Sequence, residues 1–206
     1  WSKVAGRIHA YIGLGANVGD PRRTLERAVA SLASLPGARL VGVSRLYRTR
    51  PVGVLDQPDF LNAVAALDLP TPSDPTRGAI DLLVALKRLE RESGRRHRRR
   101  WGPRELDLDL LLYGDHRIVT DRPPGAAPAS DALDPAAATP LLEVPHPSLG
   151  ERLFVLAPLA DLAPGLVPPG RVSSIEATRV RRLGVEGPDA VVAIGAWDRA
   201  AGAWRA

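Results

Sequence analysis

The sequence predicts an α+β fold in which two helices pack on one face of an antiparallel sheet. Four short segments show alternating or continuous apolar residues, and two longer segments repeat apolar residues at helical spacing. Their order along the chain, β-α-β-β-α-β, is the split βαβ or ferredoxin-like pattern. Additional helices near the C-terminus would extend this core to three layers, α-β-α.

The six elements of this core are bounded by turn and capping residues. Asp20 and Pro21 suit the N-cap and the first turn of the first helix. Gly94 suits the end of the second helix. Strands are predicted at 8–14, 39–47, 60–69 and 106–112, and helices at 21–35 and 76–92.

Three glycines follow or end the first strand, at positions 13, 15 and 19. Their spacing, G-x-G-x-x-x-G, differs from the dinucleotide-binding fingerprint, and the sequence contains no Walker A loop. We interpret these glycines as residues of a tight turn.

Beyond the core the pattern changes twice. Residues 121–140 contain five Pro and seven Ala without an apolar period, which predicts a flexible surface insertion over 121–141. Apolar order then returns, and we expect one domain over 8–170. Residues 171–206 form a C-terminal extension whose role the sequence does not indicate, with one possible late strand at 191–194.

Composition restricts the class of protein. The 206 residues include no Cys, which excludes disulfides and Cys-ligated metals. No apolar run approaches the length of a transmembrane helix, and the N-terminus lacks a secretory pattern, so we expect a cytoplasmic protein. The formal net charge is +5, which suits a polyanionic ligand.

The strongest chemical signal is the acidic pair Asp107 and Asp109. Side chains two residues apart on a strand share one face, so these carboxylates would lie about 7 Å apart. Such a pair can converge on metal ions, and hard oxygen ligands favour Mg²⁺. The alternative for a bare D-x-D is a solvent-facing strand, but the Leu residues alternating with these acids indicate a core on the other side.

A basic run precedes the acidic pair. Nine of the 28 Lys and Arg residues lie between Lys87 and Arg104. Arg can bind phosphate oxygens in a bidentate way, and Trp101 could stack on a planar ring. A nucleic-acid-binding module is the alternative, although it explains neither the acidic pair nor Asn62.

Two further polar positions have open alternatives. Asn62 interrupts an apolar strand, either at a sheet edge or as a hydrogen-bonding anchor in a pocket, with Phe60 on the same face. His146 lies between two prolines that would hold it rigidly, either near phosphates or in a structural role.

Six short blocks occur along the chain in a fixed order: 11–17, 47–49, 56–62, 100–109, 144–147 and 154–159. In this order they resemble the 6-hydroxymethyl-7,8-dihydropterin pyrophosphokinases of folate biosynthesis. The block at 100–109 (RWGPRELDLD) is the densest. One departure is Phe60, which stands where Tyr is common in the family.

The resemblance implies transfer of a pyrophosphoryl group from ATP to the pterin hydroxymethyl oxygen, with release of AMP. It implies two Mg²⁺ ions bound by Asp107 and Asp109, with Arg104 as a third catalytic residue. It also implies mobile loops at 49–59 and 94–103. The implied substrate-binding residues are Thr49, Val52, Phe60, Asn62, Trp101 and Phe154. The implied nucleotide-binding residues are Glu90, Trp101, Arg104, Leu110, Arg122, His146 and Arg152.

Three alternatives remain open at the level of sequence. An ordinary phosphoryl kinase would release ADP instead of AMP, and the residues alone do not separate the two reactions. A non-catalytic binding relative is disfavoured by the intact acidic pair. The resemblance implies a monomer with small-molecule partners and no nucleic acid or membrane partner, while the first residue, Trp1, leaves open a fusion to another enzyme of the pathway.

Overall fold

The computed structural model describes residues 6–51, 56–94, 102–122 and 140–206. Within these ranges lie the strands β1 (Arg7–Ala16), β2 (Arg39–Val43), β3 (Leu46–Thr49), β4 (Phe60–Pro70), β5 (Asp107–Tyr113), β6 (Ile118–Thr120), β7 (Leu142–Val144), β8 (Val191–Asp198) and β9 (Ala203–Arg205). The helices are α1 (Pro21–Ala33), α2 (Pro75–Glu92), the short 3₁₀ helix η1 (Pro147–Gly150), α3 (Leu153–Leu162) and α4 (Ile175–Glu186).

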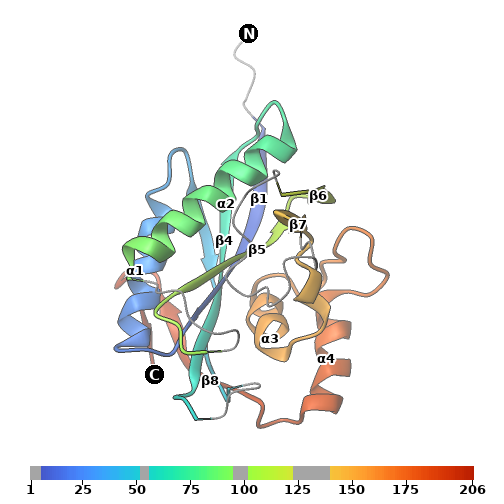
Figure 1. Ribbon diagram of the computed structural model, residues 1–206. Coiled ribbons are helices and arrows are strands. Elements are labelled where there is room, and N and C mark those ends of the chain that lie inside the picture. The colour runs from blue at the N-terminus through green and yellow to red at the C-terminus, as the bar shows by residue number, and fades with distance from the viewer. Residues whose placement is uncertain (1–5, 52–55, 95–101, 123–139) are drawn as a thin grey trace.

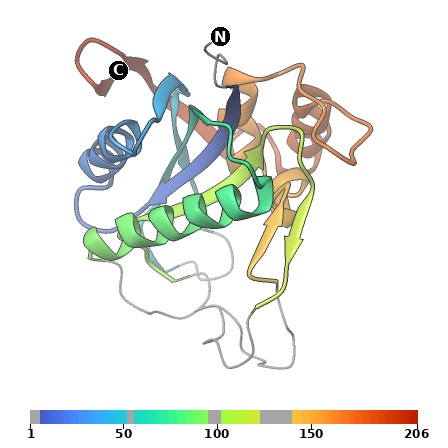
Figure 2. The same cartoon turned by 90° about the horizontal axis from the view of Figure 1, so that it is seen from above.

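The main sheet has the strand order β5-β1-β4-β3-β8-β9, with β2 also paired to β4. Its first four strands and the two helices α1 and α2 confirm the predicted ferredoxin-like core. Helices α1 and α2 cover one face, and α3 and α4 lie on the other (Figures 1 and 2). The fold is therefore α+β with three layers.

Local sequence explains why α1 and α2 begin where they do. Each starts with Pro directly after an Asp N-cap. The Asp20 carboxylate accepts from the backbone N–H of Arg23, and the Asp74 carboxylate accepts from the backbone N–H of Thr76. These bonds satisfy donors that the first helical turn leaves without partners.

The predicted strand at 39–47 is divided into β2 and β3 at Ser44. Both strands pair with β4, and the register shifts between Leu40 and Gly42. Ser44 bonds twice to Val64 of β4, through its backbone N–H and through its side-chain oxygen. The hydroxyl oxygen thus replaces a backbone acceptor where the ladder is interrupted.

Two hydrophobic clusters lie on opposite faces of the sheet. The larger joins β1, β4 and β5 to α1 and α2 and contains Ile12, Leu14, Leu25 and Leu108. The smaller joins Val64 and residues of β5 to α3 and α4. The second cluster covers one part of its face, and the same face carries the polar residues of the candidate site.

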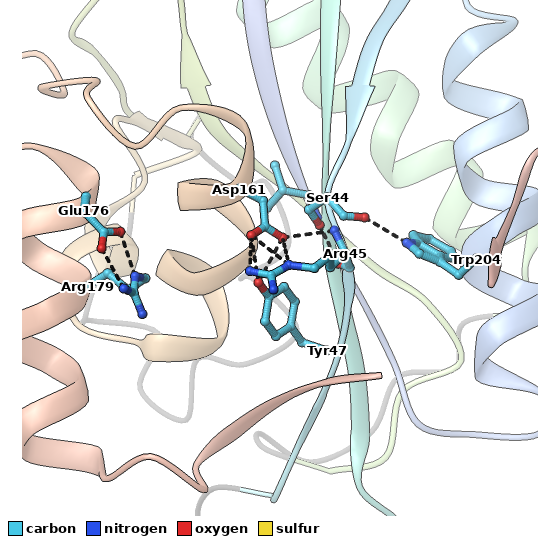
Figure 3. Close-up of polar contacts among 8 residues, drawn as sticks. Ser44, Arg45, Tyr47, Asp161, Glu176, Arg179 and Trp204 are labelled. Atoms are coloured by element: carbon cyan, nitrogen blue, oxygen red, sulfur yellow. Dashed lines mark hydrogen bonds and ion pairs between the residues drawn. The ribbon is translucent and has the colours of Figure 1, made fainter. Parts of the chain in front are cut away.

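The C-terminal segment joins the main sheet. The predicted strand at 191–194 is confirmed as part of β8, which pairs with β3 in antiparallel fashion. Trp204 of β9 is 2% exposed and lies in the larger cluster. Its indole Nε1–H donates to the carbonyl of Ser44 (2.8 Å; Figure 3).

The predicted insertion at 121–141 lies mostly outside the described residues. On either side of it, β6 and β7 form a separate two-stranded antiparallel sheet. Among the helices that the structure describes, none is both long and apolar enough to cross a membrane.

Candidate active site

The acidic pair lies on β5, as the alternation of the sequence predicts. Leu106, Leu108 and Leu110 are buried, whereas Asp107 and Asp109 are partly exposed. The two carboxylates therefore share the face turned away from the core beneath α2. Strand β5 is the last strand at one end of the main sheet's strand order.

A row of directly opposed residues places Asn62 on the same face as Asp107. Gly15 of β1 pairs with Asp107 of β5 on one side and with Asn62 of β4 on the other. A Cβ added at Gly15 would lie 3.1 Å from Asn62 Oδ1 and 3.9 Å from Asp107 Cβ. The glycine thus leaves open the space between the acid and the amide.

This row corrects the interpretation of the glycines as turn residues. Gly13 and Gly15 lie within β1, which runs to Ala16. Only Gly19 of the three has a positive φ, 68°, as a turn residue would. Strand pairing is a long-range property, so the spacing of glycines along the chain did not reveal it.

Asn62 is an anchored residue within the sheet and not at its edge. It is 7% exposed, and its Nδ2 donates to Thr49 Oγ1 at 2.8 Å. Thr49 is opposite Phe60 in the β3–β4 pair, and Thr49 is also buried. The structure thereby brings together three of the predicted substrate-binding residues at one end of β3 and β4.

Asn17 joins three segments around this site, a role that the sequence analysis missed. Its Oδ1 accepts from Arg104 N at 2.8 Å, and its Nδ2 donates to Pro58 O at 3.0 Å and to Gln57 Oε1 at 3.1 Å. Its backbone N–H also donates to Arg104 O. Asn17 is 3% exposed, so these bonds replace the hydrogen bonds to water that its amide loses on burial.

Arg104 lies beside the acidic pair. Its Nη1 is 3.1 Å from Asp107 Oδ1. The donor set fits Mg²⁺, because this ion commonly binds through one or two carboxylates and takes its remaining ligands from water and substrate phosphates. Within the described ranges there is no group of three or more His, Cys, Asp or Glu side chains placed to hold a metal.

A Lys–Glu pair on α2 contacts the backbone between the two aspartates. Glu90 Oε1 accepts from the N–H of Leu108 (2.7 Å) and from Lys87 Nζ (2.7 Å), and Lys87 Nζ donates to the carbonyl of Leu108 (3.0 Å). Lys87 Nζ is also 4.0 Å from Asp109 Oδ1. Among the described residues β5 pairs with β1 alone in the main sheet, and on its other edge this Lys–Glu pair bonds the backbone of Leu108 as a neighbouring strand would.

The charge of Lys87 is stabilised by its neighbours. Burial alone would lower the pKa of Lys87, but Asp109, Glu90 and Asp107 together outweigh it and raise the pKa above its ordinary value. Lys87 is thus a cation beside the acidic pair at neutral pH. Only the i,i+3 spacing of Lys87 and Glu90 could have indicated the pair from sequence.

Three other predicted ligand residues belong to η1 and α3, which lie on the face of the sheet that α1 and α2 do not cover. Arg152 and Phe154 flank Leu153 at the start of α3, and the Arg152 guanidinium lies over the Phe154 ring at 5.6 Å. His146 N-caps η1, its Nδ1 accepting from Ser148 N at 3.3 Å, and its backbone N–H donates to Leu111 O of β5. The capping bond is a structural role for one ring nitrogen.

For several predicted residues the structure does not describe a side-chain position in the site. Val52, Trp101 and most of the basic run lie outside the described residues, as do parts of the two predicted loops. The Leu110 side chain is buried in the core. Arg122 follows β6 at the border of the undescribed segment.

The fold and site define an α+β domain of the type found in HPPK-DHPS structures. The wild-type Plasmodium falciparum HPPK-DHPS with pterin and p-hydroxybenzoate aligns with a TM-score of 0.66, covering 95% of this chain and 46% of that chain. A second HPPK-DHPS, in complex with substrates, aligns with a TM-score of 0.68 over 92% of this chain. Sequence identities are 14% and 10%, so this likeness concerns the fold alone. The chain spans about half the length of these proteins.

The chain belongs to the 7,8-dihydro-6-hydroxymethylpterin-pyrophosphokinase (HPPK) family, whose model matches residues 11–164. The 2-amino-4-hydroxy-6-hydroxymethyldihydropteridine pyrophosphokinase of Pseudomonas aeruginosa is 44% identical over 162 residues, which cover 78% of this chain and 85% of that protein. The enzyme of the same name from Bacillus subtilis is 40% identical over 153 residues, covering 74% of this chain and 77% of that protein.

Proposed function

We propose that this chain transfers a pyrophosphoryl group from ATP to 6-hydroxymethyl-7,8-dihydropterin, giving the pterin diphosphate and AMP in folate biosynthesis. Membership of the HPPK family supports the reaction, and ATP is the co-substrate. The single structural observation that carries the proposal is the row formed by Asp107, Gly15 and Asn62. In this row the carboxylate of Asp107 and the amide of Asn62 lie on the same face of the sheet.

In this proposal the pterin binds at the Asn62 end of the row. Asn62 hydrogen-bonds the pterin ring, while Phe60 and Phe154 pack near it, and Thr49, Val52 and Trp101 complete the pocket. The Thr49 hydroxyl fixes the Asn62 amide at 2.8 Å, which supports a preorganised anchor.

The polyphosphate binds at the other end of the row. Asp107 and Asp109 would hold two Mg²⁺ ions, which would supply positive charge to neutralise the phosphates. Arg104, beside Asp107, binds the oxygens of the phosphate that is transferred. The remaining nucleotide contacts in this proposal come from Glu90, Trp101, Leu110, Arg122, His146 and Arg152.

Catalysis in this arrangement depends on alignment and charge stabilisation. The hydroxymethyl oxygen attacks the β-phosphorus of ATP in line with the departing AMP oxygen, and the protein needs no covalent nucleophile. The partly exposed carboxylates and the Arg104 guanidinium supply fixed charges around this position. Within the same proposal the protein is a monomer that acts in the cytoplasm on small molecules.

The transfer type is tested by following the phosphates. ATP labelled at both the β and γ positions is incubated with Mg²⁺ and the pterin alcohol, and the products are separated. The expected result is AMP without label and a pterin carrying both labelled phosphates. ADP with a singly phosphorylated pterin would overturn pyrophosphoryl transfer in favour of an ordinary kinase.

The alternative function, a nucleic-acid-binding module, is distinguished from the proposed enzyme by the salt dependence of its binding. That alternative predicts binding to DNA or RNA that weakens steeply with salt, and no turnover of the pterin. Sedimentation at micromolar concentration tests the proposed monomer.

A further inference from the structure

The C-terminal segment contacts two elements that carry proposed substrate residues. The HPPK family model ends at residue 164, before α4, β8 and β9 begin. These later elements are nevertheless integrated: α4 packs beside α3 (Figure 1), and β8 pairs with β3. Helix α3 begins next to Phe154, and β3 ends at Thr49.

The first contact is a cap on α3 supplied by α4. Arg152, the N-cap residue of α3, makes no side-chain capping bond. Instead Glu186 Oε1 accepts from the backbone N–H of Leu153 at 3.1 Å, and Arg182 holds the same oxygen through Nη2 at 2.7 Å. A carboxylate at a helix N-terminus accepts from a backbone N–H that has no partner within the helix, and its negative charge interacts favourably with the helix dipole. Leu153 lies between the two site residues Arg152 and Phe154, so this bond fixes the turn that carries both.

The second contact is the pairing of β8 with the substrate strand. Val191 is opposite Thr49, and Ala193 is opposite Tyr47. The β8–β9 hairpin is itself held by Trp204, which packs edge-to-face on Trp197 and donates to the carbonyl of Ser44, two residues before β3. At the start of β3, Leu46 pairs with Gly195 of β8. The hairpin therefore contacts both ends of β3.

Asp161 of α3 ties these two elements together. Its carboxylate accepts from Arg45 Nη2 at 2.6 Å and from the Tyr47 hydroxyl at 2.9 Å, so that α3 and β3 are joined directly (Figure 3). In the same view Glu176 and Arg179 of α4 pair only with one another among the residues drawn. A displacement of α4 would thus shift α3, which carries Phe154, and through Asp161 it would shift β3, which carries Thr49.

We propose that residues 175–205 are a positioning segment for the substrate site, in which Glu186 sets the first turn of α3 and β8 sets the end of β3. The inference rests on the proposed roles of Thr49 and Phe154 in pterin binding. Glu186 and Trp204 act through these residues and touch no substrate themselves.

The test compares Glu186→Ala, Glu186→Gln and Trp204→Phe with the matched control Glu176→Gln. Gln keeps the oxygen that accepts from Leu153, and Phe keeps one aromatic ring in place of the Trp204 indole but removes its donor and part of its packing. Glu176 belongs to the same helix, and its carboxylate pairs with Arg179 instead of capping the first turn of α3. For each folded variant, kcat and the KM values of the pterin and of ATP are measured at a temperature well below unfolding.

Glu186→Ala is expected to raise the pterin KM about three- to tenfold, the range that loss of a helix cap allows, while kcat changes less than about twofold. Glu186→Gln should recover most of this loss, and Trp204→Phe should raise the pterin KM in the same direction. A pterin KM for Glu186→Ala equal to that of Glu176→Gln would overturn the inference while leaving the proposed function intact. Absence of turnover by the unmodified protein would overturn both.

Discussion

Glu90 Oε1 lies 2.7 Å from the backbone nitrogen of Leu108, the residue between Asp107 and Asp109. Glu90 is 2% exposed, and it binds this N–H from α2 across the free edge of β5. Together with Lys87, which donates to the carbonyl of the same residue, it holds both polar groups of one peptide position. The orientation of the two carboxylates is therefore set partly by a helix that bears neither of them.

Replacement of Glu90 by Ala leaves the Leu108 donor and the Lys87 ammonium without this acceptor. A buried unsatisfied donor costs about 1–3 kcal/mol, so the free energy of unfolding in urea should fall by that amount. The Mg²⁺ concentration for half-maximal activity should also rise, because the carboxylates are less well oriented. Glu92→Gln is the matched control: Glu92 forms an exposed pair with Arg88 on the same helix and should change stability by less than about 0.5 kcal/mol. Equal effects of the two substitutions would contradict this role of Glu90.

Gly15→Ala should weaken pterin binding specifically. The new Cβ would stand 3.1 Å from Asn62 Oδ1, and the amide must shift to accommodate it. We expect the pterin KM to rise about tenfold, since small displacements of a positioning group are costly in catalysis. Gly13→Ala is the control on the same strand, because its Cβ would meet the Leu111 side chain at 3.4 Å or more. Equal pterin KM values for the two variants would show that Asn62 is not the anchor.

Asn17→Ala should destabilise the protein and lower kcat together. The substitution removes bonds to Arg104, Pro58 and Gln57 in a buried position, and we expect a loss of about 2–3 kcal/mol in the free energy of unfolding. Ser34→Ala, which removes one exposed side-chain bond to Ala30 O, should cost less than about 0.5 kcal/mol. If Asn17→Ala keeps full kcat, Arg104 does not depend on this amide for its position.

The Tyr47–Asp161 contact predicts a loss of stability in alkali. Burial first, and then the Asp161 carboxylate, raise the pKa of Tyr47 above its ordinary value. A folded-state pKa above the unfolded one stabilises the protein fully below about pH 10, and this contribution is lost as the pH rises through the folded pKa.

Urea unfolding of the unmodified protein and of Tyr47→Phe, at intervals from pH 7 to 11, measures this effect. The variant lacks the hydroxyl that bonds Asp161, so its free energy of unfolding should be lower by about 1.5–3 kcal/mol at pH 7. Since every other titrating group is shared, the difference between the two proteins should shrink above about pH 10. A difference that stays constant to pH 11 would mean that the pKa of Tyr47 is the same in the folded and unfolded states, which would contradict its raised value in the fold.

The local features of this protein could be predicted from its sequence. Asp20 and Asp74 cap the two core helices through bonds to backbone groups two or three residues away, and periodicity alone places Asp107 and Asp109 on one face. Each depends on residues that are neighbours along the chain, which is the information that a single sequence carries.

The long-range features could not be predicted in this way. The row that joins Asp107, Gly15 and Asn62 depends on the register of three strands, and the contacts of Asn17 join segments about 40 and 87 residues away. The position of β8 beside β3 likewise depends on tertiary packing, because its sequence indicates a short strand but no partner. Without strand register, Gly15 resembles any turn glycine.

We propose above all that Asp107 and Asp109 carry the metal-dependent transfer of pyrophosphate to the pterin. The most direct measurement is the rate of AMP and pterin diphosphate formation, at increasing Mg²⁺, by the unmodified protein and by Asp109→Asn. We expect equal amounts of both products, and a rate that falls by about two orders of magnitude in the variant without loss of stability, as for the loss of about 3 kcal/mol of charge stabilisation. An Asp109→Asn protein that forms both products at the unmodified rate and with the same Mg²⁺ dependence would contradict it.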